Sequence, residues 1–344
     1  MAPPARPKLN LTTKERFANH FAPLRGQAYT ETTTQQRGGN QDRDRNHTIR
    51  SIAWNPVGTL VATGSSDKTL RVWNPEKPNI RSSTELKGHQ AGIEKVAFNP
   101  IKDAELCSVS HDGVVKFWDV RTKACVNEVK GLGSANSLAW APDGTSLLVG
   151  NKSGSLYRIS PTQSAILSSH PQPVETSQMS FCWSGQKVFL PNRDGEVRIV
   201  SYPELEPIAY VNYDAGESTE FVLKGHTAPC LTTELSPTGR FLATGGADAV
   251  ICLYDTQDWI CQRTISRILG PVRSISFTFD GRFVVGGCDE GSGIEVTQTE
   301  TGEHVHTFKT AGPCDTVAWA PTRYCLAYSD LGILRIIGVD ADRK

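Results

Sequence analysis

The stretch His111–Val120, "HDGVVKFWDV", combines a glycine turn, alternating apolar residues and a Trp-Asp pair. Related stretches recur along the chain, each with a strand that ends in a large apolar residue before a turn rich in Asn, Pro, Asp and Gly. The aligned apolar residues are Trp54, Phe98, Trp140, Trp183, Leu235, Phe277 and Trp319. Their spacings are 44, 42, 43, 52, 42 and 42 residues, so the chain contains seven copies of one unit.

Each copy contains the pattern of several short strands. In the first copy, an apolar strand ("TLVATGSS") follows the aligned Trp54, and a tight turn leads to a further strand ("TLRVWN"). A more polar strand, as in "STELKGH", closes the unit. Four short strands in a repeat of this length are typical of a β-propeller blade. The sequence therefore predicts an all-β fold, a seven-bladed propeller over residues 28–340.

The last copy shows three strands and then stops at "GVDADRK". We expect an N-terminal strand at Ala28–Thr34 ("AYTETTT") to supply its fourth strand and close the ring, which would remove an exposed sheet edge. Residues 28–47 would then be the closing strand and a linker, residues 1–27 a flexible basic tail, and residues 341–344 a C-terminal tail. The 52-residue interval predicts an insertion near residues 212–220 in blade four.

The charge of the chain does not identify a partner, whereas its cysteine content indicates a cellular compartment. Lys+Arg and Asp+Glu both number 36, but residues 1–50 carry nine basic and four acidic side chains. A basic head on an acidic body fits contact with acidic surfaces or phosphates, and it equally fits a soluble tail. The nine cysteines contain no CxxC pair, which favours reduced thiols in the cytosol or nucleus. No apolar run approaches the roughly 18–20 residues of a membrane span.

Few residues suggest chemistry. His304 and His306 lie two apart on one predicted strand face, but two ligands without a third favour an exposed pair over a metal site. The sequence contains no Gly-x-Ser-x-Gly elbow and no phosphate-binding loop. We therefore expect no catalytic residue, no metal and no cofactor, and we expect the protein not to be an enzyme.

The pairs Gly88-His89, Gly225-His226 and Trp118-Asp119 make the repeat resemble the WD40 family. This resemblance implies a buried hydrogen-bonded set that staples a blade, and only blade two carries the whole set. Its members are His89, Ser110, Asp112 and Trp118. The segment Trp118–Arg121 also resembles the WDxR box by which some propellers dock as substrate receptors on cullin–RING ubiquitin ligases.

One further position in the repeat is polar in five blades. It lies four residues before the aligned apolar residue, where each inner strand begins at the mouth of the central channel. The residues are Arg50, Glu94, Asn136, Arg273 and Asp315. We expect them to form a rim that binds an extended partner segment of matched charge. The alternative is that they only pair with one another around the rim.

Several stretches are similar to the third-subunit family of the THO complex, the nuclear assembly that couples transcription to mRNA packaging and export. They include "GNKSGSLYRIS", "VRIVSYPELEPI" and "TVAWAPTR", and "SYPEL" is the most specific because propeller geometry does not dictate it. The resemblance runs from about Arg50 to the C-terminus. It implies a nuclear scaffold that binds the large helical THO subunit and TREX export factors, with mRNA contacted indirectly. The alternatives are a ubiquitin-ligase substrate receptor and a chromatin or histone-tail reader.

Overall fold

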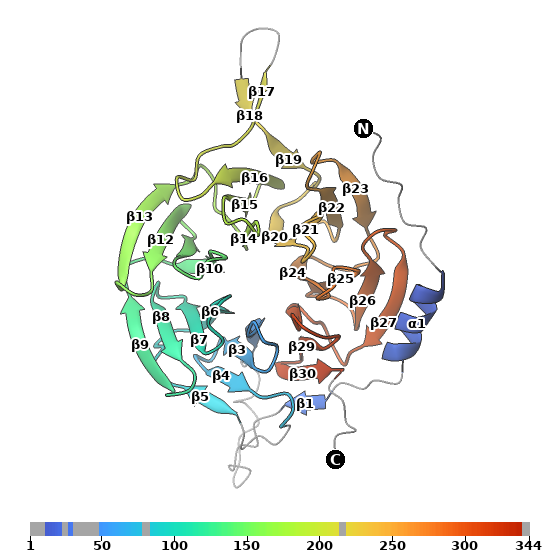
Figure 1. Ribbon diagram of the computed structural model, residues 1–344, viewed down its shortest axis with the longest axis horizontal. Helices are drawn as coiled ribbons and strands as arrows, with labels where there is room; N and C mark the ends of the chain where they lie inside the picture. Colours follow the sequence, from blue (N-terminus) through green and yellow to red (C-terminus); the bar gives the residue numbers. More distant parts are fainter. Residues whose placement is uncertain (1–10, 23–26, 30–47, 78–82, 213–217, 339–344) are drawn as a thin grey trace.

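Seven four-stranded antiparallel sheets are arranged around a common axis, each with its first strand innermost (Figure 1). This arrangement confirms the predicted seven-bladed propeller. The computed structural model describes residues 11–22, 27–29, 48–77, 83–212 and 218–338. Within these ranges, no helix is long and apolar enough to cross a membrane.

The strands of blades one to four follow one another in chain order. Blade one contains β2 (Ile49–Trp54), β3 (Val61–Ser65), β4 (Leu70–Trp73) and β5 (Thr84–Leu86). Blade two contains β6 (Ile93–Phe98), β7 (Glu105–Ser110), β8 (Val115–Asp119) and β9 (Ala124–Val129). Blade three contains β10 (Ala135–Trp140), β11 (Leu147–Asn151), β12 (Ser155–Ser160) and β13 (Ala165–Pro171). Blade four contains β14 (Ser180–Phe181), β15 (Lys187–Pro191), β16 (Glu196–Ser201) and β19 (Val222–Lys224).

Blades five to seven complete the ring, and the last takes its outer strand from the N-terminal region. Blade five contains β20 (Cys230–Leu235), β21 (Phe241–Gly246), β22 (Ile251–Asp255) and β23 (Cys261–Ile265). Blade six contains β24 (Val272–Phe277), β25 (Phe283–Cys288), β26 (Gly293–Gln298) and β27 (His304–Lys309). Blade seven contains β28 (Val317–Trp319), β29 (Leu326–Asp330), β30 (Ile333–Ile337) and β1 (Gln27–Tyr29).

The second strand of each blade forms the core between neighbouring blades. Every residue of β11, β21 and β25 is buried, because these strands are covered on both faces. Such strands read as continuous apolar or small-residue runs instead of alternating ones. A Cβ added at Gly64 of β3 would lie 2.6 Å from Ile93 of the next blade. Close approach of the blades therefore requires glycine at this position.

The closing strand β1 pairs antiparallel with β30, and Ala28 lies opposite Arg335. Tyr29 is buried, and its hydroxyl donates a hydrogen bond of 2.8 Å to the carbonyl of Pro75, beyond the end of β4. The N-terminal strand thus completes blade seven and contacts blade one, as the strand count predicts. The rest of the predicted strand, Thr30–Thr34, lies outside the described residues.

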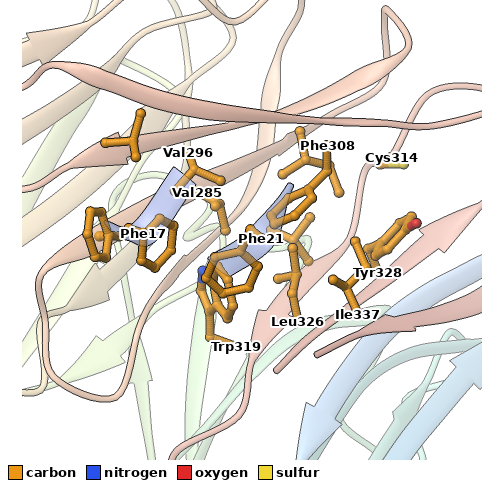
Figure 2. Close-up of a cluster of buried hydrophobic side chains, with 14 residues drawn as sticks. Phe17, Phe21, Val285, Val296, Phe308, Cys314, Trp319, Leu326, Tyr328 and Ile337 are labelled. Atoms are coloured by element: carbon orange, nitrogen blue, oxygen red, sulfur yellow. The ribbon is translucent and has the colours of Figure 1, made fainter. Parts of the chain in front are cut away.

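A helix, α1 (Leu11–Phe21), lies where the sequence analysis expects a flexible tail. It packs against β27 on the outside of blade six (Figure 1). Phe17 and Phe21, four residues apart and therefore on one helix face, point into the cluster of buried side chains shown in Figure 2. The ring centroids of Phe17 and Phe283 are 3.7 Å apart. This segment is therefore part of the folded core, and the expectation of a free tail is wrong for residues 11–21.

Blade four differs from the repeat in two ways. A two-stranded hairpin, β17 (Tyr210–Asn212) and β18 (Ser218–Glu220), lies at the expected insertion and projects from the ring (Figure 1). In addition, the turn that follows Trp54 in blade one follows Phe181 in blade four, as the backbone hydrogen bonds at Asn55 and Cys182 show. Phe181 is thus the aligned apolar residue. Trp183, which the sequence alignment selects, lies in the turn and is 59% exposed.

Candidate functional site

The predicted staple of blade two is divided between two serines. Nε2 of His89 lies 2.6 Å from Oγ of Ser108, and Nε1 of Trp118 donates to the same oxygen at 2.8 Å. Ser110 instead donates to the carboxylate of Asp112 in the adjacent turn. The residue that joins the histidine to the tryptophan is therefore Ser108. The single network of four residues that the WD40 resemblance implies does not form in this blade.

The histidine of this set is held neutral. Burial, and to a smaller extent the nearby charge of Lys116, lower the pKa of His89 to about 4. Nδ1 of His89 has no hydrogen-bond partner among the described residues. Asp112 is exposed, and it accepts hydrogen bonds from Ser110 and from the backbone N–H of Val114.

Blade five contains the linked arrangement that the sequence analysis assigns to blade two alone. Nε2 of His226 lies 2.8 Å from Oγ1 of Thr244, and Nδ1 lies 3.1 Å from Oδ1 of Asp248. The same carboxylate accepts a 3.0 Å hydrogen bond from the backbone N–H of Thr227. Gly225-His226 is one of the pairs that carry the WD40 resemblance, and Asp248 precedes Tyr254 by six residues, as Asp112 precedes Trp118. The sequence pattern does not reveal this set, because blade five has Tyr254 at the position where blade two has tryptophan.

A hydroxyl at one register recurs in three blades. Nε1 of Trp73 donates to Oγ1 of Thr63 at 3.0 Å, as Trp118 does to Ser108. The three hydroxyls belong to the second strand of their blade: Thr63, Ser108 and Thr244. In blades one and two the hydroxyl accepts a hydrogen bond from a tryptophan, and in blade five it lies within hydrogen-bond distance of His226. All of these contacts are internal to a blade. The hydroxyls at this register and the rings that contact Ser108 in blade two are buried, so these members of the staple have a structural setting.

The predicted rim coincides with a regular defect in the inner strands. The ladder between the first and second strand shifts register at Arg50, Glu94, Asn136 and Arg273. A β-bulge of this kind leaves one residue unpaired and re-aims its side chain. The structure therefore gives four of the five rim residues the same backbone setting, at the start of an inner strand. The fifth, Asp315, lies just before β28.

The rim residues of blades one, two and three contact neighbouring polar groups. Arg50 forms an ion pair with Glu94 of the next blade, and Nδ1 of His111 lies 3.4 Å from the same carboxylate. Nδ2 of Asn136 donates to Glu175 at 2.8 Å. Of these contacts, only the Arg50–Glu94 pair joins two rim residues of consecutive blades, which is the arrangement that the alternative of mutual pairing expects.

The remaining rim residues pair inside their own blade. Arg273 donates to Asp289 at 2.9 Å, and Asp315 accepts from the hydroxyl of Ser329 at 2.8 Å. The side chains of Arg50 and Arg273 nevertheless stay 43% and 50% exposed. Exposed ion pairs of this type contribute little to stability. Both guanidinium groups are therefore paired but still accessible to solvent.

Other candidate groups have local roles. Nε2 of His304 lies 2.8 Å from Glu295 and 2.9 Å from the hydroxyl of Thr307. Across the described ranges, no group of three His, Cys, Asp or Glu side chains could hold a metal ion. In the WDxR segment, Trp118 is buried, whereas Arg121 is exposed and lies 3.3 Å from Asp119. Arg121 is thus the most exposed residue of that segment, and Asp119 is partly exposed.

The chain matches the family described as WD domain, G-beta repeat over residues 41–74, 80–119 and 217–255. These three ranges contain strands of blades one, two and five, the blades in which the staple hydroxyl is hydrogen-bonded. The match to the family and the geometry of the staple therefore agree on which blades keep the regular WD40 pattern.

Among similar proteins, THO complex subunit 3 of Arabidopsis thaliana is 30% identical over 85% of this chain and 93% of that protein. WD repeat-containing protein AAC3 of Dictyostelium discoideum is 29% identical over 94% of this chain and 69% of that protein. The human serine-threonine kinase receptor-associated protein is 27% identical over 61% of this chain and 55% of that protein. The first similarity extends over nearly the whole of both chains.

Proposed function

This chain belongs to the THO complex subunit 3 family, and on that basis we propose that it is a non-catalytic scaffold subunit of a nuclear THO complex. Its role is to couple transcription to mRNA packaging and nuclear export through protein–protein contacts. Its partners are other THO subunits, above all the large helical one, and TREX export factors, while mRNA is contacted indirectly. The observation that carries this proposal is the similarity to THO complex subunit 3 over most of both chains.

The geometry supports a scaffold. Seven blades close into one ring, and the closing strand belongs to the same chain, so the ring presents several fixed faces at once. Several weak contacts made together give a tight assembly without any single strong site. His89 and Cys107, whose pKa values are shifted mainly by burial, lie inside the blades and away from any surface that a substrate could reach. We therefore propose binding without catalysis.

Co-purification tests the proposal directly. The tagged full chain is recovered from nuclear extract, and the bound proteins are identified by mass spectrometry. Recovery of THO subunits in stoichiometric amounts is the expected result. Recovery of a cullin adaptor or of nucleosomes without THO subunits would favour the ligase-receptor or chromatin-reader alternative and overturn the proposal.

A charge reversal locates the partner surface. We propose that the rim formed by Arg50, Glu94, Asn136, Arg273 and Asp315 binds an acidic or mixed-charge segment of a THO or TREX partner. The double variant Arg50→Glu with Arg273→Glu should weaken recovery of that partner without lowering the melting temperature, because both side chains are half exposed. Arg121→Glu is the matched control, since Arg121 is also exposed but lies beyond the opposite end of its blade. Equal recovery with the double variant and the wild type would place the interface elsewhere.

A further inference from the structure

A groove lies beside the end of α1, between the outer strand of blade six and the strands of blade seven. Its volume is about 630 Å³, and Phe21 of α1, Phe308 of β27 and Ile337 of β30 belong to its lining. These three side chains also belong to the buried cluster in Figure 2. The groove therefore has an apolar part that begins where the helix ends. Cavities of this size and character are typical of ligand sites.

Blade seven contributes two polar donors to this groove, Tyr328 and Arg335. They lie directly opposite each other in the ladder between β29 and β30, so they share a sheet face. Tyr328 is 2% exposed, and Figure 2 shows its hydroxyl directed away from Phe21. Burial raises the pKa of Tyr328 to about 12, so the hydroxyl stays protonated. No group among the described residues accepts its hydrogen bond, although a buried tyrosine usually has an acceptor.

One carboxylate holds Arg335 in place and leaves part of its guanidinium group free. Nε of Arg335 lies 2.6 Å from Oδ2 of Asp330. Asp330 is buried, and it also accepts 3.1 Å hydrogen bonds from the backbone N–H groups of Ala311 and Gly312. The terminal nitrogens of Arg335 form no hydrogen bond within the part of the chain that the structure describes, and the side chain is 29% exposed. These nitrogens can therefore donate to a ligand in the groove.

Blade six supplies a second cation. Lys309, the last residue of β27, is exposed and forms no ion pair with any described side chain. His306 alternates with Phe308 on the same strand, and burial lowers the pKa of His306, so its ring is uncharged at neutral pH. The charged residues in the described lining are therefore two cations, Arg335 and Lys309, and one anion, Asp330, with a net charge of +1. One carboxylate balances this charge, whereas a phosphate group exceeds it.

We propose that this groove binds an acidic, amphipathic peptide segment of a partner protein. A carboxylate of the segment accepts hydrogen bonds from Tyr328, Arg335 and Lys309. A neighbouring apolar side chain of the segment packs against Phe21 and Phe308. The segment thus extends the cover that α1 already provides over the outer strand of blade six (Figure 1).

The groove is separate from the rim at the mouth of the central channel. The five rim residues, all of which the structure describes, are not part of the lining of the groove. The two surfaces can therefore be tested independently. The inference rests on the groove alone and does not depend on which complex the protein joins.

Isothermal titration calorimetry on the full chain tests the proposal. The probe is a short acetylated and amidated peptide in which glutamates alternate with leucine and phenylalanine. We expect saturable binding that weakens as the salt concentration rises, because the charges of the groove and the peptide attract each other. The same peptide with lysine in place of each glutamate should not bind.

Two variants remove donors from the groove. Tyr328→Phe deletes only the hydroxyl and should weaken binding about tenfold, the usual effect of losing one hydrogen bond to a charged group. Lys309→Glu should weaken binding by a similar factor, because it places a like charge beside the peptide. Lys224→Glu is the matched control, since Lys224 ends the outer strand of blade four as Lys309 ends that of blade six. Melting temperatures of the variants separate loss of binding from loss of fold.

Two results would contradict the proposal. One is the absence of saturable binding of the acidic peptide to the wild type up to about 1 mM. The other is an equal affinity of the wild type, Tyr328→Phe and Lys309→Glu for that peptide. If the double variant Arg50→Glu with Arg273→Glu lost the binding instead, the peptide site would be the rim and not the groove.

Discussion

The hydroxyl of Ser108 connects an indole, an imidazole and a strand in the interior of blade two. It lies within hydrogen-bond distance of His89 and accepts from Trp118, and all three residues are buried. A buried donor that loses its acceptor costs more than the bond itself contributes, because the donor stays desolvated. Ser110, two residues further along the same strand, bonds to the exposed Asp112 and, at 3.4 Å, to the carbonyl of Val114 in the same turn.

Ser108→Ala should therefore lower the free energy of unfolding by about 1–3 kcal/mol. Ser110→Ala is the matched control, and it should cost less because its partner Asp112 can be hydrated. Urea denaturation of both variants measures the difference. An equal loss in both variants would show that Ser110 shares the stapling role that the sequence assigns to it.

The neutral state of His89 makes blade two sensitive to acid. The pKa of His89 in the folded protein, about 4, lies below its ordinary value near 6.5, so the unfolded chain binds the proton more readily. The stability that this residue contributes is present above pH 6.5 and is lost as the pH falls towards 4. We expect His89→Gln to be less stable than the wild type at pH 7, with the gap narrowing by about 1–3 kcal/mol at pH 4.5.

Thermal melts of the wild type and the His89 variant at both pH values check this expectation. His170→Gln provides a control, since the ring of His170 lies beside the hydroxyl of Ser168 and forms no ion pair among the described residues. A gap between wild type and His89→Gln that stays constant with pH would mean that the folded protein accommodates the charged imidazole.

At this scale the sequence predicts the staple's ring side chains but not its hydroxyl. Ser108 and Ser110 are the same residue type on the same strand face, so pattern alone cannot choose between them. The choice depends on where the Trp118 indole nitrogen points, which tertiary packing decides. In blade five the sequence contains His226, Thr244 and Asp248, but the WD40 pattern identifies the set by its tryptophan, and blade five has Tyr254 there.

Among the secondary-structure elements, α1 departs most from expectation. Alternating apolar residues reveal the repeated strands, but α1 lies outside the repeats and is only about three turns long, so its sequence carries a weak helical pattern. Phe17 and Phe21 carry its information. They pack with Phe308, Trp319 and Tyr324, which belong to strands or turns of blades six and seven. A contact between distant segments of this kind is not readable from a local sequence period.

Phe21→Ala should lower the free energy of unfolding by about 3–5 kcal/mol, the usual cost of removing a buried phenylalanine. Asn19→Ala, on the exposed side of the same helix, should have little effect. Differential scanning calorimetry of the two variants compares them. Identical melting of Phe21→Ala and the wild type would show that α1 does not contribute to the stability of the propeller.

The bulged inner strands show the opposite case, in which the sequence locates a feature without explaining it. The sequence shows that the position four residues before the aligned apolar residue is polar in five blades. The structure adds that four of these residues lie at β-bulges. Their pairing with one another is a matter of side-chain geometry. The hairpin of blade four was located by spacing alone, because an inserted segment lengthens one repeat without a pattern of its own.

For the whole molecule, closure of the ring brings the seven inner strands around one axis (Figure 1). In six blades the residue before the aligned apolar position is small and half-buried: Ala53, Ala97, Ala139, Ser180, Ser276 and Ala318. Blade five places Glu234 there instead. No hydrogen bond or ion pair to its carboxylate occurs among the described residues. Burial raises the pKa of Glu234 to about 7.

The consequence is a stability that falls as the carboxyl group ionises. The folded pKa of Glu234 lies above its ordinary value of 4.5, so the contribution of the protonated form is complete below pH 4.5 and is lost as the pH rises through 7. Glu234→Gln stays neutral at every pH. Relative to the wild type, the free energy of unfolding of this variant should rise by about 1–3 kcal/mol between pH 5 and pH 8, a range that allows for water reaching the side chain.

Glu204→Gln, at an exposed position, should show no such change. Urea denaturation at both pH values measures the gain. A variant that is destabilised equally at pH 5 and pH 8 would show instead that the ring requires the carboxylate, and the half-buried acid would then be a structural acceptor at the centre of the propeller.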